Sequence, residues 1–152
     1  MKKHDKKKRH KLQLRHLTLD DFEQIHALME HIYGNLGGAW SHAQYTSQLQ
    51  RFPEGQIAIE DNGELVAATF SMIVVYNDFG DSHTYGQITG DGMISHHTPQ
   101  GDTLYGVDIF VHPKYRGLRL GRRLYDARKE LCKNLNLRRF VAGGRIPHYH
   151  KY

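Results

Sequence analysis

The spacing of hydrophobic residues along the chain predicts three helices. The first begins after Thr18 and Asp21, which have the spacing of a capping box, and ends near Gly34. A second pair with this spacing, Ser41 and Gln44, precedes a shorter helix. The third helix is the longest, and its apolar face is formed by Leu120, Leu124, Ala127, Leu131 and Leu135.

Apolar runs between these helices predict strands. The predicted strands are residues 13–16, 56–60, 65–76, 104–111 and 138–142. The second and third of them flank Asp61-Asn62-Gly63, and Asn-Gly between two apolar runs is the strongest short-range signal for a β-hairpin. Residues 77–103 contain few aliphatic side chains, and we expect them to form a long loop or an inserted excursion.

Length and composition limit the classes of protein that fit this sequence. The chain has 152 residues, of which 39% are hydrophobic, so one domain with a core of ordinary size is expected over residues 12–152. The sequence contains no apolar run long enough to span a membrane and no signal peptide, which predicts a cytoplasmic protein without membrane contact. Its single cysteine, Cys132, excludes an internal disulfide and a cysteine-based zinc site.

Charge is distributed unevenly along the sequence. Residues 1–11 contain seven Lys and Arg against one Asp, a net charge of +6, and are expected to form a basic disordered tail. Residues 12–113 carry a net charge of −11, whereas residues 114–152 carry +10. The two basic segments suggest nucleic-acid binding as one hypothesis, although solvated basic runs are more often non-specific, and we do not expect a nucleic-acid partner.

The segment from Val111 to Leu124 has the pattern of an anion-binding turn. It runs from a strand through Gly117 and Gly121, among several arginines, into the start of the third helix. The first N–H groups of a helix have no acceptor within the helix, and the helix dipole is positive at that end. Backbone amides and arginine side chains can therefore bind a pyrophosphate there, and glycine lets the backbone approach it closely.

This segment resembles the cofactor motif of the GNAT superfamily of N-acetyltransferases, Arg/Gln-x-x-Gly-x-Gly/Ala. Arg116 and Gly121 match its first and last positions, whereas Arg119 stands where the family usually has glycine. The order of predicted elements resembles the family from residue 12 onward. The resemblance implies a mixed, mostly antiparallel α/β sheet flanked by helices, and the chain is expected to be truncated at its C-terminus.

Several segments look similar to the acetyltransferase-like region found ahead of carbon–nitrogen hydrolase (nitrilase-type) domains. These are residues 51–57, 104–126 and 142–147. The likeness implies a C-terminal hydrolase domain in a longer protein. Because Cys132 lies on the apolar side of a predicted helix, no amidase activity is expected within these residues.

The resemblance also implies roles for individual residues, with acetyl-CoA as the cofactor. The residues expected to bind it are Ile109, Phe110, Val111, Arg116, Gly117, Leu118, Arg119, Leu120, Gly121, Arg122 and Arg123. Asp108 is a candidate general base for an incoming ammonium, or alternatively a structural carboxylate. Tyr149, or Tyr152, is a candidate acid for the leaving thiolate. The histidines at 83, 96, 97, 148 and 150 are scattered, so no metal site is expected.

Two functional hypotheses follow from the resemblance. The first is an acetyl-CoA-dependent N-acetyltransferase in which a primary amine, on a small molecule or a peptide, attacks the thioester directly. The second is a non-catalytic acyl-CoA-binding or regulatory domain of a larger carbon–nitrogen hydrolase, a hypothesis prompted by Arg119 at a glycine position. A homodimer is compatible with both.

Overall fold

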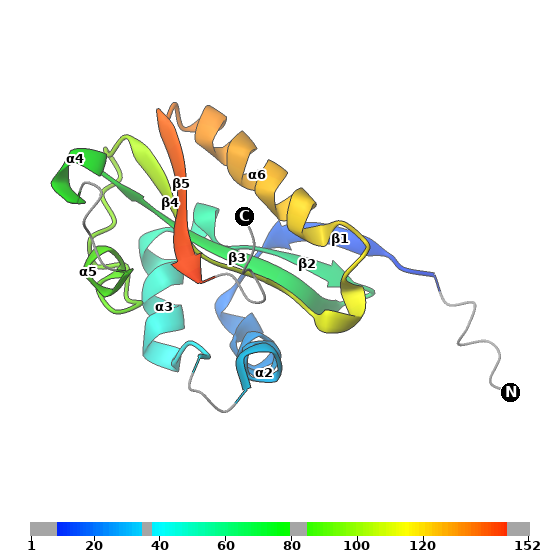
Figure 1. Ribbon diagram of the computed structural model, residues 1–152. Coiled ribbons are helices and arrows are strands. Elements are labelled where there is room, and N and C mark those ends of the chain that lie inside the picture. The colour runs from blue at the N-terminus through cyan, green and yellow to red at the C-terminus, as the bar shows by residue number, and fades with distance from the viewer. Residues whose placement is uncertain (1–8, 35–37, 80–84, 146–152) are drawn as a thin grey trace, which may run out of the picture.

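The computed structural model describes residues 9–34, 38–79 and 85–145, whose arrangement is shown in Figure 1. Within these residues five strands form one sheet, and their order in the sheet is their order along the chain. The strands are β1 (Leu12–His16), β2 (Ile57–Asp61), β3 (Glu64–Val74), β4 (Thr103–Val111) and β5 (Arg139–Arg145). Neighbours from β1 to β4 are antiparallel and the β4–β5 pair is parallel, which confirms the predicted mixed, mostly antiparallel sheet.

Helices cover both faces of this sheet. They are α2 (Phe22–Tyr33), α3 (His42–Arg51), α4 (Tyr76–Phe79), α5 (Tyr85–Thr89) and α6 (Leu120–Asn134). Figure 1 shows α6 along one face, with α2 and α3 against the other. Alternation along β2 divides the core accordingly, since Ile57 and Ile59 pack with Leu120 and Leu124 of α6, whereas Ala58 belongs to the cluster on the opposite face. Among the described residues, none of the helices combines the length and apolar character that a membrane crossing needs.

Local sequence signals account for most of these element boundaries. Asn62 and Gly63 have φ values of +52° and +93°, so both central residues of the β2–β3 turn are left-handed, as a tight hairpin turn requires. The Ser41 hydroxyl accepts a hydrogen bond from the Gln44 N–H at 3.1 Å, which confirms the cap of α3. At the first helix, the segment after Thr18 forms a 3₁₀ turn, and α2 begins only at Phe22.

Apart from two short helices, the described part of residues 77–102 has no regular secondary structure, as predicted, but it is packed into the core. It contains the end of α4 and all of α5, and Ile88 and Ile94 are buried in the core. Polar side chains of α3 hold the following turn: the Gln48 amide donates to the Gly92 carbonyl at 2.8 Å, and the Ser47 hydroxyl donates to the Met93 carbonyl. A few buried aliphatics with side-chain hydrogen bonds thus order a segment whose composition is typical of loops.

Candidate functional site

The connection between β4 and α6 has the backbone geometry of a tight anion-binding turn. Pro113–Tyr115 form a 3₁₀ turn, after which Gly117 has a φ of +92°. Arg119, the residue before α6, has a φ of +61° and a ψ of +31°, which is the left-handed region. Arg119 therefore adopts the conformation that the resembled motif usually obtains from glycine, at a cost of about 1–2 kcal/mol for an L-residue.

The N-terminus of α6 offers free hydrogen-bond donors. The first bond of the helix runs from the Arg123 N–H to the Arg119 carbonyl at 3.1 Å, so the N–H groups of Leu120, Gly121 and Arg122 have no acceptor within the helix. The first turn contains no acidic residue, and Arg119 makes no capping hydrogen bond with its side chain. These donors and the positive end of the helix dipole suit a negatively charged group.

The space around this turn also fits a phosphate ligand. A Cβ atom added at Gly117 or Gly121 would have no protein atom within 4 Å, so both glycines leave the backbone accessible. Arg116, Arg119, Arg122 and Arg123 are all exposed, and the Arg122 Nε lies 3.3 Å from the Asp126 carboxylate one turn along α6. The cofactor-binding residues predicted on the turn are thus brought together at one helix end.

No described residue pairs with β4 beyond Asp108 on the edge that faces away from β3. Pairing with β5 extends along β4 to Asp108, opposite Arg145, in the part of the chain that the structure describes. The His112 N–H donates to the Val66 carbonyl at 2.7 Å, and the direction of strand hydrogen bonds alternates from residue to residue. The backbone groups of Ile109 and Val111 therefore point away from β3, and the side chain between them, Phe110, is buried on the α2 face.

Asp108 is buried at the point where β5 leaves β4. The residue is 1% exposed, and its Oδ1 accepts hydrogen bonds from the Tyr33 hydroxyl at 2.7 Å and from the Ile109 N–H at 3.0 Å. Tyr33 is the last residue of α2, so this contact joins the helix layer to the sheet. The carboxylate is therefore held firmly in place, and Tyr33 is a partner that the sequence did not indicate.

Arg128 is a second residue that sequence reasoning missed. It lies on the inner face of α6, four residues after Leu124, and its Nη2 donates to the carbonyls of Phe70 and Asp108 at 2.8 and 2.7 Å. Strand pairing shifts register at both places, after Phe70 and between Gly106 and Asp108, so the guanidinium binds carbonyls beside two bulges. Burial lowers the pKa of Arg128 to about 10, opposed by the negative charge of Asp108, so Arg128 remains protonated at neutral pH.

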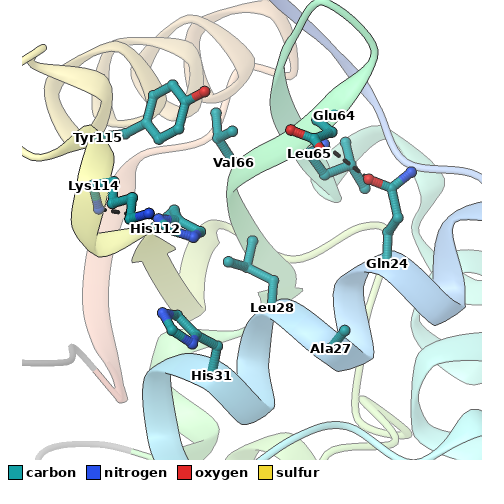
Figure 2. A pocket seen from close by; sticks show the side chains of 10 residues that line it. All are labelled: Gln24, Ala27, Leu28, His31, Glu64, Leu65, Val66, His112, Lys114 and Tyr115. Atoms are coloured by element: carbon teal, nitrogen blue, oxygen red, sulfur yellow. Dashed lines mark hydrogen bonds between the residues drawn. The ribbon is translucent and has the colours of Figure 1, made fainter. Parts of the chain in front are cut away.

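A pocket of about 460 Å³ lies on the other side of the turn, between α2 and the start of β3 (Figure 2). It is lined by Gln24, Ala27, Leu28, His31, Glu64, Leu65, Val66, His112, Lys114 and Tyr115. The imidazole rings of His31 and His112 stack in its wall, with 5.0 Å between centroids. Because its lining comes from three distant segments, no single motif in the sequence predicts this pocket.

Tyr115 fixes the turn to the β2–β3 hairpin. Its hydroxyl donates to the Asp61 Oδ2 at 2.6 Å, and the Lys11 N–H donates to the other carboxylate oxygen at 2.7 Å. The bond from Tyr115, then those from Lys11 and His10, lower the pKa of Asp61 to about 2. The same bond, with burial, raises the pKa of Tyr115 to about 12.

Most of the remaining sequence-predicted residues are not described by the structure. Tyr149 and Tyr152 lie outside the described residues, as do His83, His148 and His150. His97 accepts a hydrogen bond from the Ile73 N–H through its Nδ1, at 3.0 Å, and stacks on Phe52. Within residues 9–34, 38–79 and 85–145, no group of three or more His, Cys, Asp and Glu side chains could hold a metal ion.

Two curated proteins of Bacillus subtilis (strain 168) are similar to this chain. The probable hydrolase YhcX is 39% identical over 142 residues, which are 93% of this chain and 28% of YhcX. The uncharacterized N-acetyltransferase YkwB is 37% identical over 152 residues, covering 98% of this chain and 67% of YkwB. The chain thus spans about a quarter of the length of the first relative and two thirds of the second.

Solved structures and a family model agree with this similarity. The loading GNATL domain of CurA from Lyngbya majuscula superposes with a TM-score of 0.73 at 21% identity, covering 87% of this chain and 64% of that one. The aminoglycoside N-acetyltransferase AAC(6')-Iy in complex with CoA has a TM-score of 0.62 at 12% identity, with 95% of both chains covered. These two likenesses show the fold, and the model of the acetyltransferase (GNAT) family matches residues 19–148. The chain therefore belongs to the acetyltransferase (GNAT) family, a family of acyltransferases.

Proposed function

We propose that this chain is a cytoplasmic, acetyl-CoA-dependent N-acetyltransferase whose acceptor is a primary amine. The observation that carries the proposal is the N-terminus of α6, where free amides, two unobstructed glycines and four exposed arginines meet in a chain of this family. In this proposal the amides between Leu118 and Arg122 bind the pyrophosphate, above all those of Leu120, Gly121 and Arg122, which have no acceptor within the helix, and the arginines neutralise its charge.

The open edge of β4 supplies the second part of the proposed site. The backbone groups of Ile109 and Val111 point away from β3, and since the Ile109 N–H already donates to Asp108, the Ile109 carbonyl and the Val111 N–H and carbonyl are placed to bind the amide groups of an extended pantetheine arm. When bound, acetyl-CoA would supply a thioester whose C–S bond breaks as the amine nitrogen forms the new C–N bond. A backbone N–H beside the thioester would stabilise the negative charge that develops on its oxygen.

Asp108 is the proposed general base. An ammonium ion must lose a proton before its nitrogen can attack, and a carboxylate within hydrogen-bond reach can accept that proton directly or through water. Because Asp108 is buried, the proton would reach its carboxylate through bonded neighbours, and the Tyr33 hydroxyl that donates to Oδ1 is a proposed part of that route. Tyr149, outside the described residues, is the proposed acid that protonates the departing thiolate.

Binding of acetyl-CoA to the purified chain tests the first part of this proposal. Calorimetric titration of the wild type is expected to give saturable binding, and Gly121→Trp is expected to abolish it, because the indole would fill the space over the helix end. As a Cβ atom at Gly121 would meet no atom beyond its chain neighbours and its own helix backbone, the variant is expected to fold, and its circular dichroism provides the control. Wild-type affinity in a folded Gly121→Trp variant would remove the phosphate site.

Turnover tests the proposed base. Asp108→Asn is expected to lower kcat for thiol release in the presence of a primary amine by about 10²–10⁴-fold, the usual contribution of a general base. The dissociation constant for acetyl-CoA should change by less than about twofold, because the carboxylate does not bind the phosphates. Unchanged kcat in this variant would assign Asp108 a structural role.

A second candidate function is supported by the match to the probable hydrolase YhcX, in which the similar region is 28% of the protein. There the chain would be a non-catalytic acyl-CoA-binding or regulatory domain joined to a carbon–nitrogen hydrolase domain. The two functions differ in turnover: saturable binding of acetyl-CoA with no acetylation of any amine in a panel of diamines, aminoglycosides and peptides would favour the regulatory domain.

A further inference from the structure

His112 connects β4 to the turn that precedes the phosphate-binding residues. Its Nδ1 accepts a hydrogen bond from the Lys114 N–H at 3.0 Å and so caps the 3₁₀ turn Pro113–Tyr115. A ring nitrogen that accepts from a backbone N–H carries no proton. The neutral ring therefore carries its hydrogen on Nε2, and a second proton could enter only at Nδ1.

The groups around His112 disfavour that second proton. His31 of α2 stacks on the ring at 5.0 Å, Tyr115 meets it edge-on at 5.8 Å, and both rings line the pocket in Figure 2. Burial first, and then the charges of His31 and Lys114, lower the pKa of His112 below its ordinary value, while Glu64 of β3 acts in the opposite direction. The ring is thus neutral at neutral pH.

The turn that His112 caps leads directly into the anion-binding segment. The Tyr115 N–H donates to the His112 carbonyl at 2.8 Å, and the Leu118 N–H reaches the Tyr115 carbonyl at 3.4 Å. On its other side the turn is fixed by the hydrogen bond from the Tyr115 hydroxyl to the Asp61 carboxylate. A proton on Nδ1 would place two N–H donors against each other, so this bond would be lost, and the turn would keep its backbone hydrogen bonds and the Tyr115–Asp61 bond.

We propose that His112 is a positioning residue for the cofactor loop, and that its neutral form is required for tight binding of the CoA phosphates. The inference rests on the proposed function, because it assumes that the loop from Arg116 to Arg123 binds CoA. It gives His112 no contact with the ligand. Its effect is to hold Gly117 and the N-terminus of α6 in the geometry described above.

The experiment measures the dissociation constant of CoA by calorimetry between about pH 5 and 8, across the range in which histidine titrates. His112→Asn keeps an acceptor near the position of Nδ1 but does not titrate, whereas His112→Ala removes the acceptor. As the pH falls, the affinity of the wild type for CoA is expected to fall about tenfold more than that of His112→Asn. A change of about tenfold corresponds to the loss of one hydrogen bond. His112→Ala should bind about tenfold more weakly at every pH.

The variants separate His112 from other titrating groups. The CoA phosphates and the histidines that do not contact His112 are the same in the wild type and in His112→Asn, so the difference between the two curves belongs to His112 and its stacked neighbour His31. His16→Asn, at an exposed residue of β1, is the matched control and should follow the wild type. His31→Asn removes the stacked ring and its charge, which should raise the pKa of His112 and move the midpoint to higher pH.

Parallel curves for the wild type and His112→Asn would overturn the proposal, as would an unchanged midpoint in His31→Asn. Absence of CoA binding by the wild type at every pH would instead overturn the proposed function. If His112→Asn fails to fold, ¹⁵N spectra of the wild-type imidazole decide the matter. Nδ1 protonated at about pH 8 would contradict the tautomer on which the argument depends.

Discussion

Replacing Arg119 by glycine gives a quantitative test of the turn before α6. The φ of +61° and ψ of +31° at Arg119 cost an L-residue about 1–2 kcal/mol relative to glycine. Glycine loses more backbone freedom on folding, which cancels about 0.5–1 kcal/mol of that difference. The exposed Arg119 side chain makes no capping hydrogen bond, so its removal costs little. Arg119→Gly should therefore raise the free energy of unfolding by about 0.5–1 kcal/mol.

Urea unfolding measures this difference, and the buried Trp40, the single tryptophan of the chain, provides the fluorescence signal. The melting temperature is expected to rise by about 1–4 °C for a chain of this length. Arg119→Ala is the matched control, because it loses the same guanidinium but retains the Cβ atom that disfavours the left-handed backbone. A glycine variant no more stable than the alanine variant would refute the assigned strain.

Three further predictions follow from buried polar groups. Arg128→Met should lower the free energy of unfolding by about 3–5 kcal/mol, because it leaves Asp108 and two carbonyls without their cation. Urea unfolding measures this change, and a value below about 1 kcal/mol would contradict the role of Arg128. Burial lowers the pKa of His97 from 6.5, so the folded state binds fewer protons than the unfolded state. The urea concentration at the midpoint of unfolding should therefore fall as the pH drops below about 6.5, and it should fall less in His97→Asn. Tyr115→Phe should raise the pKa of Asp61 above about 2, as measured by carboxyl NMR, and an unchanged value would exclude the hydrogen bond as its main cause.

Sequence patterns were sufficient where the physical cause is local. The caps at Thr18 and Ser41 and the Asn62-Gly63 turn depend on residues within a few positions of each other, so the helices and the hairpin could be predicted closely. The position of the turn before α6 was also predictable, because its glycines and arginines lie within eight consecutive positions, 116–123, at the start of one helix.

The parts that could not be predicted depend on contacts between distant segments. Arg128 looks like one more surface cation of a basic helix, and its burial follows only from the two bulges that present carbonyls to it. The contact of Tyr33 with Asp108 joins α2 to β4, and no spacing rule links the two residues. The ordered packing of the loop after α5 could not be predicted, because it depends on amide side chains of α3, such as Gln48.

The agreement between strand order and chain order has a consequence for folding. Each strand from β2 to β4 pairs with the strand just before it, so this part of the sheet can assemble in chain order during synthesis. The β2–β3 pair closes through a two-residue turn, whereas residues 17–56 and 75–102 must be looped out to close the other two pairs. Until α6 emerges, however, Ile57, Ile59 and Val66 lack the helix that buries them. A nascent chain that stops before residue 120 would therefore expose an apolar sheet face, and at this stage the protein should depend most on chaperones.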